Sequence, residues 1–307
     1  MCTSPKPLIF LLFSCVCLVN SAAQSLTQDL RGFNPPTSLS FQIDHSRPSL
    51  SERVSLDMGE LRNASMWEAG DAWEFNSLSG ETIRPEGWAG LVWADTAYWA
   101  SQWFSDTLIQ LSETGEVLDA FTIPGISQVR GMTFDGQYIW TANTSGTLRA
   151  FDPNTRMIVS ALTIPGGRKA RYIAYDAVAD GGNGGFYAGD FGTDITLISK
   201  GGSILSTLPL SIHQRMGIYG LVVDRTNPDD PYLWAFDQAE WPSFATIVQL
   251  DANTGAYTGL QFDVATNVAS PFANAGGLTL KETRGEHWLA TILQDDISRL
   301  LTYRLDY

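Results

Sequence analysis

Apolar and polar positions alternate in short runs along most of the chain, and residues typical of turns separate the runs. The clearest unit covers residues 129–166, which contain the runs RGMTFD, YIWTAN, TLRAFD and MIVSALTI with Gly- or Pro-containing turns between them. Alternation with a period of two is typical of β-strands. The unit therefore predicts four consecutive antiparallel strands, and no long segment shows the period of an amphipathic helix.

The same four-run unit recurs along the chain. Each copy opens with an apolar residue that follows Gly, or Tyr172 in one copy, and these opening residues are Leu91, Met132, Ile173, Leu221 and Leu278. An aromatic residue in the second run keeps step with them, at Trp99, Trp140, Tyr187, Trp234 and Trp288. A repeat of roughly 40–50 residues with four strands in each copy is the signature of a β-propeller. We therefore expect an all-β fold, a β-propeller with four-stranded antiparallel blades.

The number of blades follows less directly from the pattern. Five copies are visible, whereas the chain length divided by the repeat gives about six. Residues 51–86 supply a candidate sixth blade, in which residues 65–68 and 72–76 resemble the second and third strands. We therefore expect six blades, with five as the alternative. The last copy stops after its third strand, so we expect the N-terminal arm to supply the ring-closing strand, at residues 38–43.

The first 23 residues have the pattern of a secretory signal peptide. Residues 7–19 form an apolar run, and Ser21, Ala22 and Ala23 have the small side chains of a cleavage site. We therefore expect a signal peptide at 1–23, an N-terminal arm at 24–50 and the propeller at 51–307. The protein is expected to be secreted or periplasmic. The apolar run is too short to span a membrane, and no later run approaches the required length.

Composition narrows the classes of partner and chemistry. The chain has 33 acidic and 19 basic side chains, a formal net charge of -14. This charge argues against nucleic acid as the main partner, because phosphate binding needs a basic face. All three cysteines, Cys2, Cys15 and Cys17, lie in the expected signal peptide. The mature protein should therefore have neither a disulfide nor a thiol nucleophile.

Several segments resemble a known family: residues 184–187 (GGFY), 217–221 (GIYGL), 229–238 (DDPYLWAFDQ), 247–255 (IVQLDANTG) and 275–278 (AGGL). Together they resemble secreted β-propeller proteins of Bacteroidetes-type bacteria, an uncharacterised repeat family that often carries a C-terminal type IX secretion sorting domain. The resemblance covers about residues 87–305 and implies the fold but little chemistry. Since no sorting domain follows the last predicted strand here, we expect Sec export. More distantly, the repeats resemble those of quinoprotein-type, gluconolactonase-like and glutaminyl-cyclase-like propellers.

Polar residues recur at one position of the repeat. Three residues after the second-run aromatic stand Gln102, Asn143, Asp190 and Asp237, with Thr291 in the last copy. We expect them at the mouth of the central channel, where the connections between strands usually carry function. Asn143, Asp190 and Asp237 could form an oxygen-rich ring that holds Ca²⁺. Alternatively, these side chains end the strands and hydrogen-bond the turn backbone themselves.

Cationic and aromatic residues are the other candidates at this mouth. Arg130 and Arg171 precede equivalent strands, where they could pair with acidic residues or bind a carboxylate bidentately. Tyr219, Trp103 and Trp241 could form aromatic walls for a ligand, or could pack over a neighbouring blade.

No nucleophile, dinucleotide or phosphate-binding motif is present in the sequence. We therefore expect a non-catalytic binding or protein-interaction scaffold, with a protein or polysaccharide partner and no cofactor unless Ca²⁺. The alternative is a metal-dependent hydrolase or lyase, gluconolactonase-like, with its site at the channel mouth. In that case Asn143 and Asp237 would supply two of the metal ligands.

Overall fold

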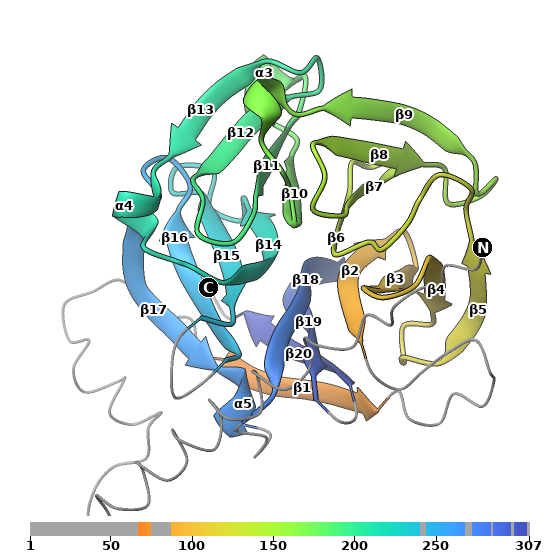
Figure 1. Cartoon of the computed structure of the whole chain (residues 1–307). Coiled ribbons are helices and arrows are strands. Elements are labelled where there is room, and N and C mark those ends of the chain that lie inside the picture. The colour runs from red at the N-terminus through yellow and green to blue at the C-terminus, as the bar shows by residue number, and fades with distance from the viewer. Residues whose placement is uncertain are drawn as a thin grey trace, which may run out of the picture. The chain divides into compact units, whose positions relative to one another are not determined.

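The structure is a computed structural model that describes residues 67–74, 87–239, 244–267, 272–283, 285–295 and 298–305. All of them belong to one compact unit, Glu60–Tyr307. Their strands form five four-stranded antiparallel sheets, which are arranged as blades around a central axis (Figure 1). The predicted all-β propeller with four-stranded antiparallel blades is confirmed.

Each blade has strands A to D from the axis outward. Blade 1 contains β2 (Trp88–Ala94), β3 (Ala97–Gln102), β4 (Thr107–Leu111) and β5 (Val117–Thr122). Blade 2 contains β6 (Gly131–Phe134), β7 (Ile139–Ala142), β8 (Thr147–Phe151) and β9 (Ile158–Thr163). Blade 3 contains β10 (Tyr172–Asp176), β11 (Gly185–Gly189), β12 (Ile195–Ser199) and β13 (Ile204–Leu208). Blade 4 contains β14 (Ile218–Asp224), β15 (Tyr232–Asp237), β16 (Thr246–Asp251) and β17 (Tyr257–Asp263). Blade 5 contains β18 (Asn274–Thr283), β19 (Glu286–Gln294), β20 (Arg299–Leu305) and β1 (Trp67–Glu74).

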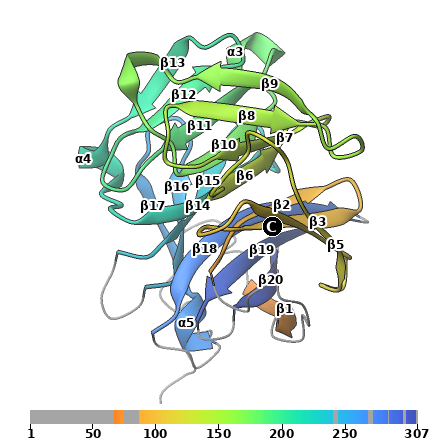
Figure 2. The ribbon, with the colours of Figure 1, turned by 45° about the vertical axis from the view of Figure 1, so that its right-hand side comes forward.

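The described helices are single turns in the connections between strands. They are the 3-10 helix η3 (Pro165–Gly167) and the α-helices α3 (Ala179–Gly182), α4 (Leu210–His213) and α5 (Val264–Asn267). The innermost strands β2, β6, β10, β14 and β18 surround the axis, while β5, β9, β13 and β17 lie at the perimeter (Figure 1 and Figure 2).

The expected number of six blades is wrong, and the alternative of five is the one observed. Within the described residues, 67–74 form a single strand, β1, where the sequence suggested two strands of a sixth blade. β1 pairs antiparallel with β20 and so supplies the outermost strand of blade 5. The place that we expected residues 38–43 to fill is therefore taken by β1, and residues 38–43 lie outside the described part of the chain. Blade 5 combines the first and the last of the described strands, which closes the ring and pairs the outer edge of β20.

Glycine at the start of the repeat allows innermost strands to meet backbone to backbone. A Cβ atom on Gly277 would lie 2.3 Å from the Leu91 nitrogen of the next blade, and one on Gly220 would lie 2.6 Å from the Leu278 nitrogen. The apolar residues that follow these glycines fill the axis, and the space between them does not admit a water molecule. The axis is therefore a packed core rather than an open channel.

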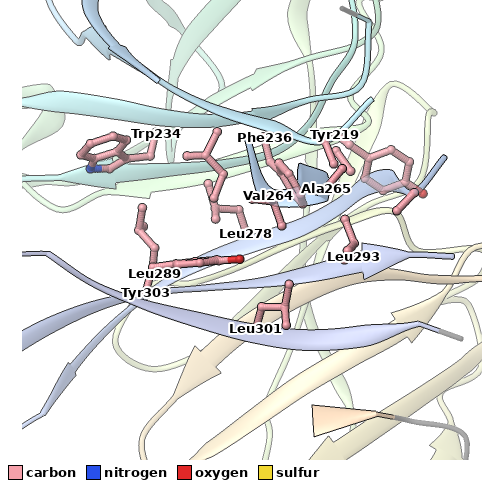
Figure 3. Close-up of a cluster of buried hydrophobic side chains, with 14 of the residues drawn as sticks. Tyr219, Trp234, Phe236, Val264, Ala265, Leu278, Leu289, Leu293, Leu301 and Tyr303 are labelled. Carbon is pink, nitrogen blue, oxygen red and sulfur yellow. The ribbon is translucent and has the colours of Figure 1, made fainter. Parts of the chain in front are cut away.

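Aromatic side chains on strand B fill the space between neighbouring blades. Trp234 is fully buried among residues of blades 4 and 5, and Figure 3 shows it in one cluster with Leu278 and Leu289. Its indole nitrogen donates to Asp224 at 2.8 Å. In blade 2, the Trp140 indole donates likewise to an aspartate, at 2.9 Å. Blades 2 and 4 thus place a large apolar side chain in the core without leaving its N–H unpaired.

Candidate functional site

A cavity of about 310 Å³ opens at one end of the axis, where the B–C and D–A connections gather. We call it the mouth cavity. Its eight lining residues come from all five blades: Trp103, Arg130, Arg171, Phe191, Tyr219, Gln238, Asn274 and Gln294. Its volume lies at the lower end of the range for small-molecule pockets. Because the axis below it is packed, a ligand has to enter from this face.

Three lining residues occupy the same position of the repeat. Arg130, Arg171 and Tyr219 each stand two residues before the axial apolar residue of the innermost strand, directly before Gly or, in blade 3, Tyr172. In blade 4 the strand pairing skips Tyr219, which makes it the extra residue of a β-bulge. A bulge redirects the side chain that it carries. The repeat therefore delivers these three side chains to the axis from neighbouring blades.

Four other lining residues share a second position, just beyond strand B. Strand pairing makes Trp103, Phe191, Gln238 and Gln294 equivalent in blades 1, 3, 4 and 5. Trp103, Phe191 and Gln238 directly follow the polar residues Gln102, Asp190 and Asp237 that the sequence highlighted. Neighbouring residues of an extended chain point to opposite sides. The alternation accordingly turns the following residue, and not the highlighted one, toward the cavity.

The highlighted polar residues bind the turns instead of lining the cavity. Gln102 is buried, and its Oε1 accepts from the Ser105 hydroxyl. Asn143 donates to the Ser127 carbonyl at 3.1 Å, and Asp237 Oδ1 accepts from a backbone N–H at 3.0 Å. Among the described residues no group of three His, Cys, Asp or Glu side chains is placed to hold a metal. The Ca²⁺ ring of Asn143, Asp190 and Asp237 remains a prediction.

The two arginines of the mouth cavity have different electrostatic surroundings. Arg171 Nε donates to Asp190 at 2.9 Å, and its guanidinium lies 3.9 Å from the Phe191 ring centroid. Arg130 lies 5.3 Å from the Trp103 ring centroid and forms no ion pair with a described carboxylate. One guanidinium is thus neutralised and held in place, while the other presents its charge to the cavity.

Three buried groups at the cavity make no hydrogen bond of acceptable geometry with described residues. They are Arg130 Nε, Tyr219 Oη and Gln294 Nε2, and each can donate. Burial raises the pKa of the Tyr219 phenol, whereas the charge of Arg130 and the approach of the Gln294 and Arg130 side chains to the phenol oxygen oppose that shift. The phenol therefore keeps its proton at neutral pH. Buried donors without acceptors are costly unless a ligand or water accepts from them.

Of the residues singled out in the sequence, the cavity brings together Trp103, Arg130, Arg171 and Tyr219. Trp241 lies outside the described part of the chain. Sequence inspection missed Phe191, Asn274 and Gln294 as candidates. Thr291, taken as the last member of the polar ring, is paired instead with Leu278 and is fully buried. Strand pairing makes Leu293 the true equivalent.

The burial of His213 predicts that the stability of the fold depends on pH. The residue is buried at the end of α4, and burial lowers the pKa of its imidazole below the ordinary 6.5, against the opposing effects of Thr193 and Asp194. Since the folded protein favours neutral His213, its stabilising contribution is complete above about pH 6.5. We expect stability to fall as the pH drops below that value, by up to about 1.4 kcal/mol per pH unit until the folded pKa is reached.

Urea unfolding between pH 7.5 and 5 measures this dependence. His213→Gln should flatten the slope in that range, because glutamine cannot take up a proton there. An unchanged slope in His213→Gln would assign the pH dependence to other groups.

Comparisons with known proteins bear on the fold. No protein-family model matches the chain, and no curated protein sequence matches it. Glutaminyl cyclase from Myxococcus xanthus is a similar solved structure, with 17% identity over 79% of this chain and 97% of the cyclase, and a TM-score of 0.58. Virginiamycin B lyase from Staphylococcus aureus matches at 11% identity over 78% of this chain and 100% of the lyase, with a TM-score of 0.45. At 17% identity the cyclase shares a propeller fold, and fold alone does not define function.

The helices that the structure describes are all too short to cross a lipid bilayer.

Proposed function

We propose that this propeller is a binding protein that takes an organic anion into the mouth cavity. The observation that carries the proposal is the pair of arginines, Arg130 and Arg171, that neighbouring blades direct into one aromatic-walled cavity. Arg171 is held by Asp190, while Arg130 has no carboxylate partner among the described residues. A carboxylate accepts hydrogen bonds from guanidinium groups in strong, charge-assisted geometry.

The other groups at the cavity favour the same class of ligand. The Tyr219 hydroxyl and the Gln294 side-chain amide lie beside Arg130 and can each donate to a ligand, and a carboxylate offers about four lone pairs that accept hydrogen bonds. Trp103, Phe191 and Tyr219 provide aromatic surface for an apolar group attached to the carboxylate. We propose that this binding occurs outside the cytoplasm, because residues 1–23 have the pattern of a secretory signal peptide.

Calorimetric titration with matched probes tests the proposal. The probes are benzoate, phenylacetate, N-acetylphenylalanine and N-acetylleucine, each paired with its neutral amide. At least one carboxylate should bind, and the affinity of its neutral amide should be lower by a factor of about ten or more, because charge-assisted hydrogen bonds are lost. Arg130→Gln should lower the affinity for the carboxylate by a similar factor.

Arg168→Gln is the matched control, because Arg168 is an exposed arginine of the D–A connection between blades 2 and 3 that does not line the cavity. It removes the same charge and should leave the affinity within about twofold. The proposal would be abandoned if no carboxylate of the set bound at 1 mM, or if Arg130→Gln and Arg168→Gln behaved alike.

A further inference from the structure

Large apolar side chains are exposed beside the mouth cavity. Trp103, Met216 and Phe272, which we call the rim, are 40%, 54% and 76% exposed. Trp103 lines the cavity itself. The Met216 carbonyl accepts from the Gly192 N–H at 3.0 Å, next to the lining residue Phe191. Phe272 precedes the lining residue Asn274 by two positions.

The rim is unusual in being gathered around a polar cavity. Single exposed apolar residues are normal on protein surfaces. Here, however, Trp103 lines the cavity and the other two lie next to lining residues in different connections, around a cavity where the Arg130 guanidinium has no carboxylate partner among the described residues. Apolar surface next to a charged pocket is typical of a site that binds a molecule larger than the pocket.

We propose that the bound anion is the C-terminal carboxylate of a polypeptide. The last residue enters the mouth cavity, its carboxylate pairs with Arg130, and its side chain contacts Phe191 and Tyr219. The preceding residues cross the rim. This inference rests on the proposed function, since it names the source of the anion that the cavity accepts.

The geometry favours a chain end over an internal acidic residue. The axis beneath the cavity is packed, so a ligand reaches the cavity from the outer face alone. A chain end points into the cavity with one segment leading away from it, whereas an internal Asp or Glu brings two flanking segments over the rim. The side-chain amides of Gln238, Asn274 and Gln294 offer both donors and acceptors, which suit the last peptide group of the chain.

The test uses N-acetylated hexapeptides whose last three residues are randomised, with either a free or an amidated C-terminus. A third set is amidated and carries an internal Asp. Binding of each set to the protein at physiological ionic strength is compared with that of the N-acetylated amino acids. We expect free-acid peptides with apolar residues before the terminus to bind at least tenfold tighter than either amidated set and than the single amino acids.

Met216→Ser and Phe272→Ser should each lower the affinity for free-acid peptides about threefold to tenfold, because they remove apolar contact outside the cavity. They should leave the affinity for N-acetylated amino acids unchanged. Met157→Ser is the matched control, since Met157 is 65% exposed but lies in the C–D turn of blade 2, at the other end of the blade. It should change neither affinity.

The outcomes separate this inference from the function on which it rests. If amino acid carboxylates bind but the peptides bind no tighter, the ligand is a free small anion and only this inference fails. If the amidated Asp peptides bind as well as the free acids, the site recognises internal acidic residues and the inference is likewise overturned. If no carboxylate binds in any form, both proposals fail.

Discussion

Replacing Gly277 by alanine should destabilise the whole propeller by about 3 kcal/mol, because overpacking of a tight core costs this much when the neighbours cannot yield. The added Cβ would lie 2.3 Å from the Leu91 nitrogen and 2.7 Å from the Ala89 carbonyl oxygen, both backbone atoms of blade 1. No rotamer change can relieve a contact with backbone. Blades 5 and 1 would have to separate, so we expect a melting temperature lower by roughly 10 °C for a domain of this size.

The matched control is Gly201→Ala in the turn after β12. A Cβ there would meet its nearest neighbour at an ordinary 3.6 Å. Neither Gly201 nor Gly277 has a positive φ, so the comparison isolates steric contact from backbone preference. Equal melting temperatures for the two variants would mean that the innermost strands are not packed backbone to backbone.

The same glycines explain why the sequence predicts the fold well. A Gly followed by an apolar residue recurs because each innermost strand has to approach the next and also fill the axis. The aromatic residue of the second run recurs because it packs between blades, as Trp140 and Trp234 do. Both packing requirements recur in successive blades, so the residues that meet them recur at a regular spacing that a single sequence reveals.

The blade count depended on a feature that the local pattern does not contain. Two apolar clusters in the region before Gly87 look alike whether they form two strands of a new blade or one strand of an existing blade. Only the pairing of β1 with β20 distinguishes these cases, and it joins residues more than two hundred positions apart in the chain. Alternation indicates strands but carries no information about their partners.

Only part of the candidate site could be predicted from the sequence, again because strand pairing is not visible in the local pattern. Arg130 and Arg171 could be found, because their position next to the axial residue is fixed by the repeat. Gln294 could not, because alignment on Trp288 is out of register with the other blades. Leu278 pairs with Thr291, so Ala290 occupies the strand position that an aromatic residue holds in the other four blades, two residues after Trp288. Counting from Trp288 therefore stops at Thr291 and misses Leu293 and the lining residue Gln294 that follows it.

Removing residues 1–86 should prevent the ring from closing. This truncation takes away β1, whose register with β20 extends from Trp67 opposite Leu305 to Glu74 opposite Arg299. The lost strand pairing is worth roughly 5 kcal/mol if each backbone hydrogen bond contributes about 1 kcal/mol net. It also leaves the edge of β20 unpaired and open to other chains. We expect the truncated protein to aggregate, as light scattering and size-exclusion chromatography would measure.

A chain that begins at Glu60 keeps β1 and is the control, because it retains the whole compact unit. It should remain monodisperse and keep the melting temperature of the complete propeller. A synthetic peptide of residues 65–76, added during refolding of the truncated chain, should restore solubility, whereas a scrambled peptide should not. Rescue in trans follows only if β1 acts through its pairing with β20, since the peptide is not joined to blade 1. A truncated chain that stayed folded and soluble without the peptide would show that four strands are not required in blade 5, and that the contacts of β18 with β14 and β2 close the ring by themselves.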